Sequence, residues 1–518
     1  INHPKNSKDI TKMVNKGVPE NKNLGFVGFS PSVQQKLHDA LIKQVEFETV
    51  LSVQTGIKEI NHIQNYNPIY GLEQFRAGDL QVPEQSYEPL YQQLLIYFSD
   101  DLHRILGMML RQGINSHSFN YGEMMMLYYQ LVDTCLTLLQ KTKPDLIVFR
   151  TIPHFVADYL LFQIAKFLNI KTITFERVEA FDAVYLIDDI DEKSPIITGI
   201  YDDPTFDEKL ERLISSTRNM LSFKPDYYIK SSKQRKFNQS LIGLSMWTCY
   251  EFAKGGVGFF TGKKMLRAIK KSVGDNKSEI SYFEIFIEKL LARIKTISLR
   301  RTYEILARPK PNSQYFLFAA NYQPERTTIP DAGNHWHFEQ IVTDISRKLP
   351  NGVKLLVREH PTIFTLPGKV HFRGSLYRTK QSYKNISKLP NVTLASCKTD
   401  IEPLIKSCVG VISLTGTVAY QANMAGKPAF LFGCRWFSRS KSMHRYQDHE
   451  SLNKFIETAL DYGNVDNLEH WYDLFYDLKS SLIPVPNLLN TDLFEETNQA
   501  YVKSLAELIK VGNDNVYE

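Results

Sequence analysis

The sequence predicts an α/β protein built from two doubly wound, Rossmann-like domains in tandem. Short apolar runs alternate with amphipathic helical segments in two separate regions, 24–179 and 314–433. A polar, proline-containing stretch at 307–314 precedes the second region and marks a domain boundary. The chain has 518 residues, which is too long for one ordinary core.

Composition and charge exclude several classes of protein. Hydrophobic residues make up 43% of the chain and charged residues 23%, as in globular proteins. The net charge of +6 suits an anionic substrate or membrane surface but falls far short of a nucleic-acid-binding footprint. Five scattered cysteines without a CxxC pair indicate a reducing compartment. No apolar run approaches the ~18 residues of a membrane span, so we expect a cytoplasmic protein, with peripheral contact at the inner face of the membrane as an additional expectation.

The first region is expected to form an N-terminal domain over 24–204, after a polar, flexible arm at 1–23. Its opening reads as strand, helix and strand, the order of a parallel sheet. Within a long helical stretch that follows, the apolar segment 121–140 favours a buried helix over a methionine-based ligand site. A βαβ unit then completes the domain. The expected elements are strands 24–29, 47–53, 144–149 and 171–179 and helices 33–44, 85–142 and 157–170.

Residues 205–310 are expected to form a helical insertion or linker. The segment 259–274, FFTGKKMLRAIKKSVG, is basic and partly amphipathic. We interpret it as a helix with a solvated face, and electrostatic contact with an anionic membrane is the alternative.

The second region is expected to form a C-terminal domain over 311–480, with 481–518 providing a helix at 492–512. Strands and helices alternate strictly here, and Asp400 and Gly426 stand where a helix N-cap and a helix C-terminus are expected. The pattern predicts an open, doubly wound sheet. The expected elements are strands 314–320, 353–358, 391–396, 409–413 and 428–433 and helices 337–350, 382–390, 400–408 and 417–426.

The segment VISLTGT at 411–417 predicts an anion-binding loop. Ser413, Thr415, Gly416 and Thr417 fall at the carboxyl end of a strand, where the next helix begins. Ligands of open parallel sheets bind at that edge, and the first amides and the dipole of a helix favour an anion such as phosphate. A plain N-cap with small residues is the alternative. The GxxxxGK[ST] spacing of a Walker A loop is absent.

Two further motifs end strands of the same predicted sheet. VREHP places Arg358, Glu359 and His360 at the end of one strand, and a histidine there can donate to a phosphoryl oxygen of a departing nucleotide. NYQPERTT places Glu325 and Arg326 after another, where an arginine can bind phosphate or carboxylate with two hydrogen bonds. A structural histidine and a surface charge are the respective alternatives.

The N-terminal region carries candidates for acid–base chemistry on an acceptor hydroxyl. His154 and Asp158 follow one strand, and Glu176 and Arg177 end the next. The sequence does not distinguish which of these four residues is the base. We interpret the acidic run DDIDE at 188–192 as a solvated loop, and no DxD-type metal-binding pair stands in the motifs.

Together, YFLFAANYQPERTT, KLLVREHP and VISLTGTVAYQANMAGKPAFLFG resemble the donor domain of bacterial capsule and surface-polysaccharide biosynthesis proteins. That group includes β-Kdo transferases and, more distantly, sialyltransferases with an HP motif. TIPHF and the helix after it resemble the N-terminal half of the group. The resemblance covers 144–180 and 314–435.

The resemblance implies a GT-B glycosyltransferase, whose two Rossmann-like domains face a cleft and whose last helix crosses back to the first domain. The donor would be a nucleotide sugar, often CMP-linked, and the acceptor a glycan or glycolipid. His360 would contact the donor phosphate, and Ser413, Thr415 and Thr417 would hold phosphate or nucleotide. His154, Glu176 or a nearby aspartate would serve the acceptor. No metal or other cofactor is implied, because protein donors can neutralise the leaving group.

One position departs from the family pattern. Gln421 stands where a glutamate usually accepts a hydrogen bond from a ribose hydroxyl. Glutamine can still bind a hydroxyl, but it lacks the charge. Two alternatives to a transferase therefore stay open: a GT-B-fold sugar-nucleotide epimerase or hydrolase, and a non-catalytic scaffold with a decayed donor site.

Overall fold

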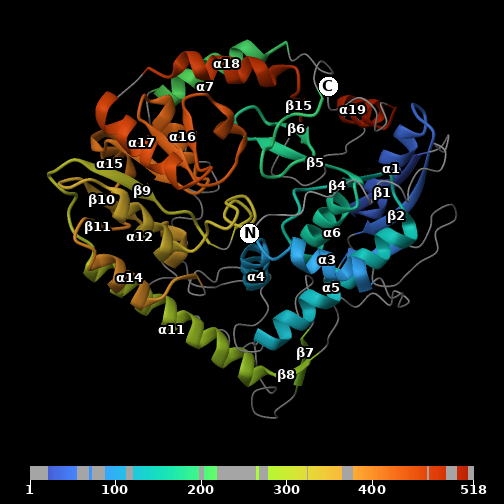
Figure 1. Ribbon diagram of the computed structural model, residues 1–518, viewed down its shortest axis with the longest axis horizontal. Helices are drawn as coiled ribbons and strands as arrows, with labels where there is room; N and C mark the ends of the chain where they lie inside the picture. The colour runs from blue at the N-terminus through green and yellow to red at the C-terminus, as the bar shows by residue number, and fades with distance from the viewer. Residues whose placement is uncertain are drawn as a thin grey trace.

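The structure is a computed structural model with two α/β halves that lie side by side (Figure 1). It describes residues 22–54, 69–72, 88–111, 121–197, 204–218, 264–267, 278–323, 325–364, 377–463, 466–485 and 499–510. The expected arm at 1–23 lies outside these residues except for its last two, which begin the first strand.

The N-terminal half contains a seven-stranded sheet in the order β15-β6-β5-β4-β1-β2-β3. Strands β1 to β5 are parallel, whereas β6 and β15 pair antiparallel at one edge. Both antiparallel strands are additions to the expected set. The strands are β1 (Lys22–Phe29), β2 (Phe47–Gln54), β3 (Ile69–Gly71), β4 (Leu146–Phe149), β5 (Lys171–Val178), β6 (Ala183–Ile187) and β15 (Ile483–Pro484).

The C-terminal half contains a six-stranded, wholly parallel sheet in the order β11-β10-β9-β12-β13-β14. In chain order this is 3-2-1-4-5-6, the strand order of a doubly wound dinucleotide-type fold. The order reverses between β9 and β12, which makes this pair the topological switch point. The strands are β9 (Tyr315–Ala319), β10 (Lys354–Arg358), β11 (Val392–Ala395), β12 (Gly410–Ser413), β13 (Ala429–Leu431) and β14 (Met443–Arg445).

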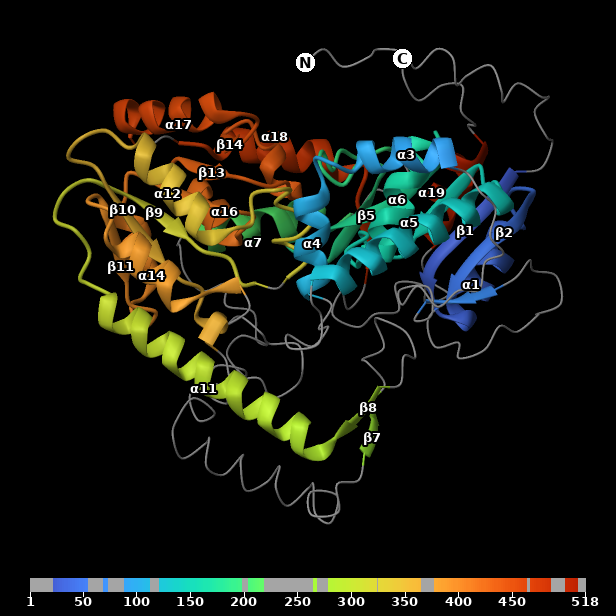
Figure 2. The ribbon, with the colours of Figure 1, turned by 60° about the horizontal axis from the view of Figure 1, so that its bottom comes forward.

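Helices cover both faces of each sheet, as parallel strands require (Figures 1 and 2). In the N-terminal half, α1 (Pro31–Leu41) and α19 (Gln499–Lys510) pack on one face, and α5 (Tyr121–Thr142) and α6 (Val156–Phe167) on the other. In the C-terminal half, α11 (Tyr282–Leu306), α12 (Phe338–Lys348), α14 (Lys380–Ser387) and α17 (His449–Tyr462) cover one face. The opposite face carries α15 (Ile401–Ser407), α16 (Thr417–Met424) and α18 (Leu468–Lys479).

The end of the chain returns from the second half to the first. After α18, the chain adds β15 beside β6 and then packs α19 against α1, with Tyr501 and Leu505 buried against Leu24 and Phe26 of β1. The protein is therefore an α/β protein with two doubly wound sheets and a crossover helix, which is the arrangement of the GT-B fold and confirms the predicted fold class. The first part of the expected helix 492–512 lies outside the described residues.

Two sequence expectations about helices need correction. The segment 259–274 is not a continuous helix, because Lys264–Arg267 form strand β7, which pairs antiparallel with β8 (Ser278–Ser281). The rest of that segment lies outside the described residues. Helix α5 is not buried all round, since Tyr121 and Met126 expose 66% and 72% of their surfaces. None of the described helices is both long and apolar enough to cross a membrane.

Candidate functional site

The switch point of the C-terminal sheet is bridged by Asn321, which follows β9. Its side-chain oxygen accepts hydrogen bonds from the hydroxyl of Ser413 (2.9 Å) and from the amide of Leu414 (3.2 Å), both at the end of β12. Its side-chain nitrogen donates to Thr415 Oγ1 at 3.2 Å. Asn321 was not predicted as a site residue, although a polar residue directly after the predicted strand 314–320 was a signal for it.

The three hydroxyls of the predicted anion loop have different surroundings. Ser413 is fully buried, and its single hydroxyl proton is shared between Asn321 Oδ1 and the carbonyl oxygen of Ala319, 2.8 Å away. Thr415 is 1% exposed and donates to the carbonyl of Thr327. Both hydroxyls therefore fasten the loop after β12 to the loop after β9. Thr417, the first residue of α16, is exposed. It is the hydroxyl of the three that faces solvent at the start of the helix.

Gly416 and Gln421 complete the local geometry around α16. A Cβ on Gly416 would lie 2.6 Å from Ser413 Oγ, so any other residue there would require the buried Ser413 hydroxyl to move. No side chain caps the amino end of α16, which leaves its first amides oriented toward the switch point. Gln421 is half-buried one helical turn after Thr417, on the same face of α16.

Gly433, just after β13, is another position where the backbone requires glycine. A Cβ there would lie 2.3 Å from the carbonyl oxygen of Asp331 and 2.6 Å from Ala332 Cα. Because both obstacles are backbone atoms, we expect Gly433→Ala to lower the free energy of unfolding by about 2–3 kcal/mol, measured by urea denaturation. Gly352→Ala is the control: its φ of +86° is unfavourable for alanine, but no atom lies within 4 Å of the added Cβ. A smaller loss for Gly433→Ala than for Gly352→Ala would contradict this packing.

His360 follows β10, the strand next to β9, and its ring is half-buried. The ring centroid lies 6.0 Å from that of Tyr322, which follows Asn321 in the loop after β9. Its Nδ1 accepts a hydrogen bond from the amide of Thr362 at 3.3 Å. An amide can only donate, so the neutral imidazole carries its proton on Nε2. His360 therefore presents Nε2 as a hydrogen-bond donor, the form suited to an anionic ligand.

Two other predicted donor-site residues have their own protein partners. The guanidinium of Arg358 donates to the carbonyl of Thr399 at 3.2 and 3.3 Å, on the side of β11. Glu325 is exposed and accepts a hydrogen bond from the hydroxyl of Thr327 at 3.1 Å, within its own loop. The structure thus brings His360 close to Tyr322 of the loop after β9, while Arg358 binds the loop after β11 and Glu325 binds a residue of its own loop.

In the N-terminal half, His154 lies in the loop after β4. Its Nδ1 is 2.7 Å from the carbonyl oxygen of Ile152. A carbonyl can only accept, so Nδ1 carries the proton and Nε2 is the basic nitrogen. His154 and His360 therefore have opposite tautomers: Nε2 accepts a proton in one and donates a hydrogen bond in the other. Asp158, predicted beside His154, is buried in the first turn of α6.

Glu176 occupies a buried ion network between the two halves. Its carboxylate is fully buried and lies 2.9 Å from Arg435 Nε, 3.4 Å from Lys193 Nζ and 3.7 Å from Arg326 Nη1. Burial alone would raise the pKa of Glu176, but Lys193, Arg435 and Arg326 outweigh it and lower the pKa to about 2. A carboxylate held so firmly in its ionised form is a poor proton acceptor near neutral pH.

Arg326 and Asp331 form the C-terminal side of this network. Asp331 is also buried and lies 3.0 Å from Lys193 Nζ and 3.6 Å from Arg326 Nη2. The side chain of Arg326 is 21% exposed, whereas those of Lys193 and Arg435 are 0% and 4% exposed, so Arg326 is the cation of the network that reaches solvent. Burial, and then the positive charge of Arg326, lower the pKa of the nearby Arg177. Positive charge therefore collects where the carboxyl end of β5 meets the second half.

The acidic run 188–192 is solvated, with Asp191 and Glu192 exposing 46% and 66% of their side chains, and it also reaches the second half through Glu192. Asp191 pairs with Arg104 at 2.8 Å, and Glu192 accepts a bond from Arg445 of β14 at 3.1 Å. Nearby, Gly107 of α4 (Leu102–Arg111) contacts the ring of Trp336, and an added Cβ would lie 2.9 Å from it. Figure 2 shows α4 between the two halves.

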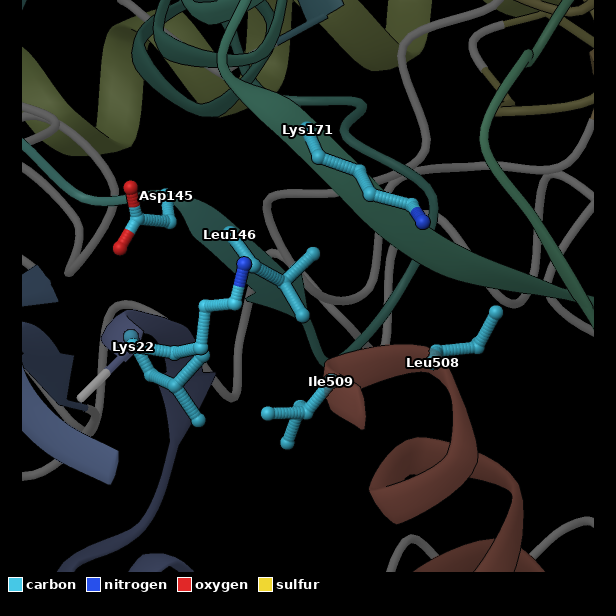
Figure 3. Close-up of a pocket in the computed structure, with 7 residues that line it drawn as sticks. Lys22, Asp145, Leu146, Lys171, Leu508 and Ile509 are labelled. Atoms are coloured by element: carbon cyan, nitrogen blue, oxygen red, sulfur yellow. The ribbon is translucent and has the colours of Figure 1, made fainter. Parts of the chain in front are cut away.

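A small pocket lies at the opposite edge of the N-terminal sheet (Figure 3). It is lined by Lys22, Leu24, Asp145, Leu146, Lys171, Leu508 and Ile509, at the amino ends of β1, β4 and β5 and against α19. Open parallel sheets bind ligands at the carboxyl ends of their strands, so this pocket is not the expected site. Within the described ranges, no group of three or more His, Cys, Asp and Glu side chains is arranged to hold a metal ion.

Comparison with known proteins gives distant structural likenesses. No protein-family model and no curated protein sequence matches the chain. Among solved structures, it resembles the Thermosulfurimonas dismutans KpsC β-Kdo 2,7 transferase at 15% identity and a TM-score of 0.21, over 38% of this chain and 67% of that one. It also resembles the UDP-GlcNAc 2-epimerase from Methanocaldococcus jannaschii at 13% identity and a TM-score of 0.23, over 88% and 99%. The epimerase from Neisseria meningitidis, bound to UDP-GlcNAc, gives 10% identity and a TM-score of 0.22, over 94% and 99%.

Proposed function

We propose that this protein is a glycosyltransferase that moves a sugar from a nucleotide-sugar donor, CMP-linked by preference, to a hydroxyl of a glycan or glycolipid acceptor. The biological setting that we propose is the assembly of a capsule or surface polysaccharide. The observation that carries the proposal is the switch point of the C-terminal sheet. The uncapped start of α16 and the exposed Thr417 follow β12 there, and His360 follows β10 and approaches Tyr322 of the loop after β9. Ligands of open α/β sheets bind there.

In this proposal the donor phosphate lies at the amino end of α16. The amides after Gly416 and the hydroxyl of Thr417 bind its oxygens, and Nε2–H of His360 stabilises the negative charge that the leaving nucleotide gains. Gln421 binds a ribose hydroxyl through its amide. Ser413 and Thr415 support the loop from inside rather than touching the ligand. These donors belong to the protein, so the proposal requires no metal ion for the leaving group.

On the acceptor side, His154 is the base that we favour over Glu176. Nε2 of His154 holds the lone pair that can remove the proton of an acceptor hydroxyl. Glu176 is fully buried and engaged by three cations, so we assign it to the contact between the halves. Arg326 and Arg177 supply the positive potential of that edge, which suits an anionic donor.

A transfer assay with product analysis tests this function. The protein is incubated with CMP-linked and UDP-linked sugars, with and without a panel of oligosaccharide and lipid-linked acceptors, and the products are identified by mass spectrometry. Acceptor-dependent release of nucleotide with an acceptor one sugar heavier is the expected result. Release of an isomeric or free sugar without an acceptor would instead identify an epimerase or a hydrolase. A scaffold, the alternative favoured by Gln421, would leave every substrate unchanged.

Thr417→Ala should weaken nucleotide binding more than it weakens folding. The lost hydroxyl is exposed, so we expect a decrease in stability of at most about 1 kcal/mol and about a tenfold loss of CMP affinity by calorimetry. Thr415→Val is the matched control. It removes a buried hydrogen bond to the loop after β9 and should lower the melting temperature. Unchanged CMP affinity in Thr417→Ala would contradict the proposed position of the phosphate.

A further inference from the structure

A second buried ion pair lies directly beneath His360. Glu359 is fully buried, and the side chain of its partner Arg378 is 2% exposed. Arg378 Nε lies 2.6 Å from Glu359 Oε2, and Nη2 lies 3.4 Å from Oε1. A pair buried this completely adds little net stability, because desolvation offsets most of the attraction. The main effect of the pair is therefore on the positions of the groups that it binds.

The carboxylate of Glu359 holds the start of the His360 loop. Its Oε1 accepts the backbone N–H of His360 at 2.9 Å, and its Oε2 accepts the hydroxyl of Tyr383 at 2.8 Å. The N–H of Glu359 itself donates to the hydroxyl of Tyr303 on α11, also at 2.9 Å. Two consecutive amides of this loop are thus fixed by buried side chains: the amide of Glu359 by Tyr303 of α11, and the amide of His360 by Glu359 itself.

Arg378 also joins this loop to the loop after β9. Its Nη1 donates to the side-chain oxygen of Gln323, and Nε2 of Gln323 donates to the carbonyl of Trp336 at 2.7 Å. The guanidinium lies over the ring of Phe338, 4.0 Å from its centroid. One side chain therefore ties together the segments that carry His360 and Tyr322, whose rings approach each other.

The tautomer of His360 depends on the same backbone geometry. The bond from Thr362 N–H to Nδ1 forms only if the turn through Pro361 keeps residues 360 and 362 in register, and this turn opens the short helix Pro361–Phe364. The amide of His360 begins that turn, and Glu359 holds it. Loss of the carboxylate would release the turn and allow the proton to move between Nδ1 and Nε2.

We propose that Glu359 and Arg378 are positioning residues that hold His360 as its Nε2–H tautomer, directed at the anionic group of the ligand. The proposal rests on the proposed function for the identity of that ligand, a nucleotide phosphate. The predicted tautomer of His360 does not depend on the proposed function. A pair that merely stabilised the core would affect the folding free energy and leave the tautomer of His360 unchanged.

The state of the imidazole is measured by NMR on the full chain with 15N-labelled histidine. Long-range 1H–15N correlations distinguish protonated from unprotonated ring nitrogens, and the spectrum of His360→Ala assigns the His360 signals. We expect a protonated Nε2 and an unprotonated Nδ1 in the native protein. In Glu359→Gln and in Arg378→Lys, the nitrogen signals should move toward the average of the two tautomers. Tyr383→Phe removes one bond to Glu359 and provides a milder third variant if either of the others fails to fold.

Two controls accompany these variants. The signals of His444, which lies in β14, serve as an internal reference within each spectrum. Asp189→Asn removes a carboxylate paired with Lys166 at 2.9 Å in the N-terminal half and should leave His360 unchanged. A native tautomer of His360 in Arg378→Lys and in Tyr383→Phe, with only a lowered melting temperature, would overturn the proposal.

CMP binding to the same variants separates this inference from the proposed function. If both hold, Glu359→Gln should lose about tenfold in CMP affinity, and adding His360→Ala should cause little further loss, because both changes remove one interaction. An altered tautomer in a protein that binds none of the nucleotides would support the positioning role and contradict the nucleotide site. A native tautomer together with normal CMP binding would support the site and reject the positioning role.

Discussion

Replacement of His360 by alanine should reduce the turnover of sugar transfer by about a hundredfold. The native imidazole presents Nε2–H, because its Nδ1 is occupied by the amide of Thr362. A hydrogen bond to the leaving phosphate strengthens as the phosphate gains charge in the transition state, so its loss should lower kcat more than it raises KM. The measurement is steady-state kinetics of acceptor-dependent nucleotide release.

A second histidine provides the control for this variant. His449 is exposed at the start of α17, and its alanine variant should retain native kinetics. Both variants should keep the native melting temperature to within a few degrees. Native turnover in a folded His360→Ala protein would remove the leaving-group role of this residue.

Glu176→Gln should lower the free energy of unfolding by about 3–5 kcal/mol. The substitution removes the negative charge that neutralises the buried side chains of Lys193 and Arg435. Removing one partner of a buried ion pair is costly, because the other charge stays buried without compensation. Glu179→Gln is the matched control, since Glu179 also binds Arg435 but is 49% exposed. Its loss should amount to less than about 1 kcal/mol. Urea denaturation at pH 7 measures both, and equal losses would contradict the buried network.

The same network predicts how stability depends on pH. The pKa of Glu176 falls from an ordinary 4.5 to about 2 because the nearby cations outweigh the opposing effect of burial. A lowered pKa in the folded state contributes stability above pH about 4.5, and that contribution disappears as the pH falls toward 2. The native protein should therefore lose stability more steeply than Glu176→Gln over this interval. Parallel curves for the two proteins would show that Glu176 is not held in its ionised form.

Much of the fold was predictable because its signals are local. Every parallel strand of the C-terminal sheet from β9 to β13 was expected within a few residues, since each is a short apolar run bounded by a loop and a helix. The antiparallel strands β6 and β15 were missed. They pair residues far apart in sequence, Ile483 with Val184, and nothing local marks that pairing. Strand β7 was misread as a helix because Lys264 and Arg267 stand three positions apart, a helical spacing, and four residues are too few to show the alternation of a strand.

The candidate site shows the same division between local and long-range information. The positions of His360 and of the loop containing Thr417 followed from strand ends alone. The burial of Glu176 could not be predicted from strand ends, because its partners Arg435 and Arg326 come from the other half of the chain. The internal role of Ser413 and Thr415 also depended on a distant residue, Asn321. Sequence spacing identified which residues gather at the edge of the sheet but not which of them face solvent.

The most direct test of the nucleotide site is thermal-shift measurement of the purified protein with CMP, UDP, GDP and ADP. A ligand that binds only the folded state raises the melting temperature by mass action. We predict a rise with CMP in the native protein, a clearly smaller rise in Thr417→Ala and a native rise in His449→Ala. A selective rise with UDP or GDP would keep the site and replace the donor. No rise with any of the four nucleotides, in protein that melts cooperatively, would contradict the account and favour the scaffold, with Gln421 as its cause.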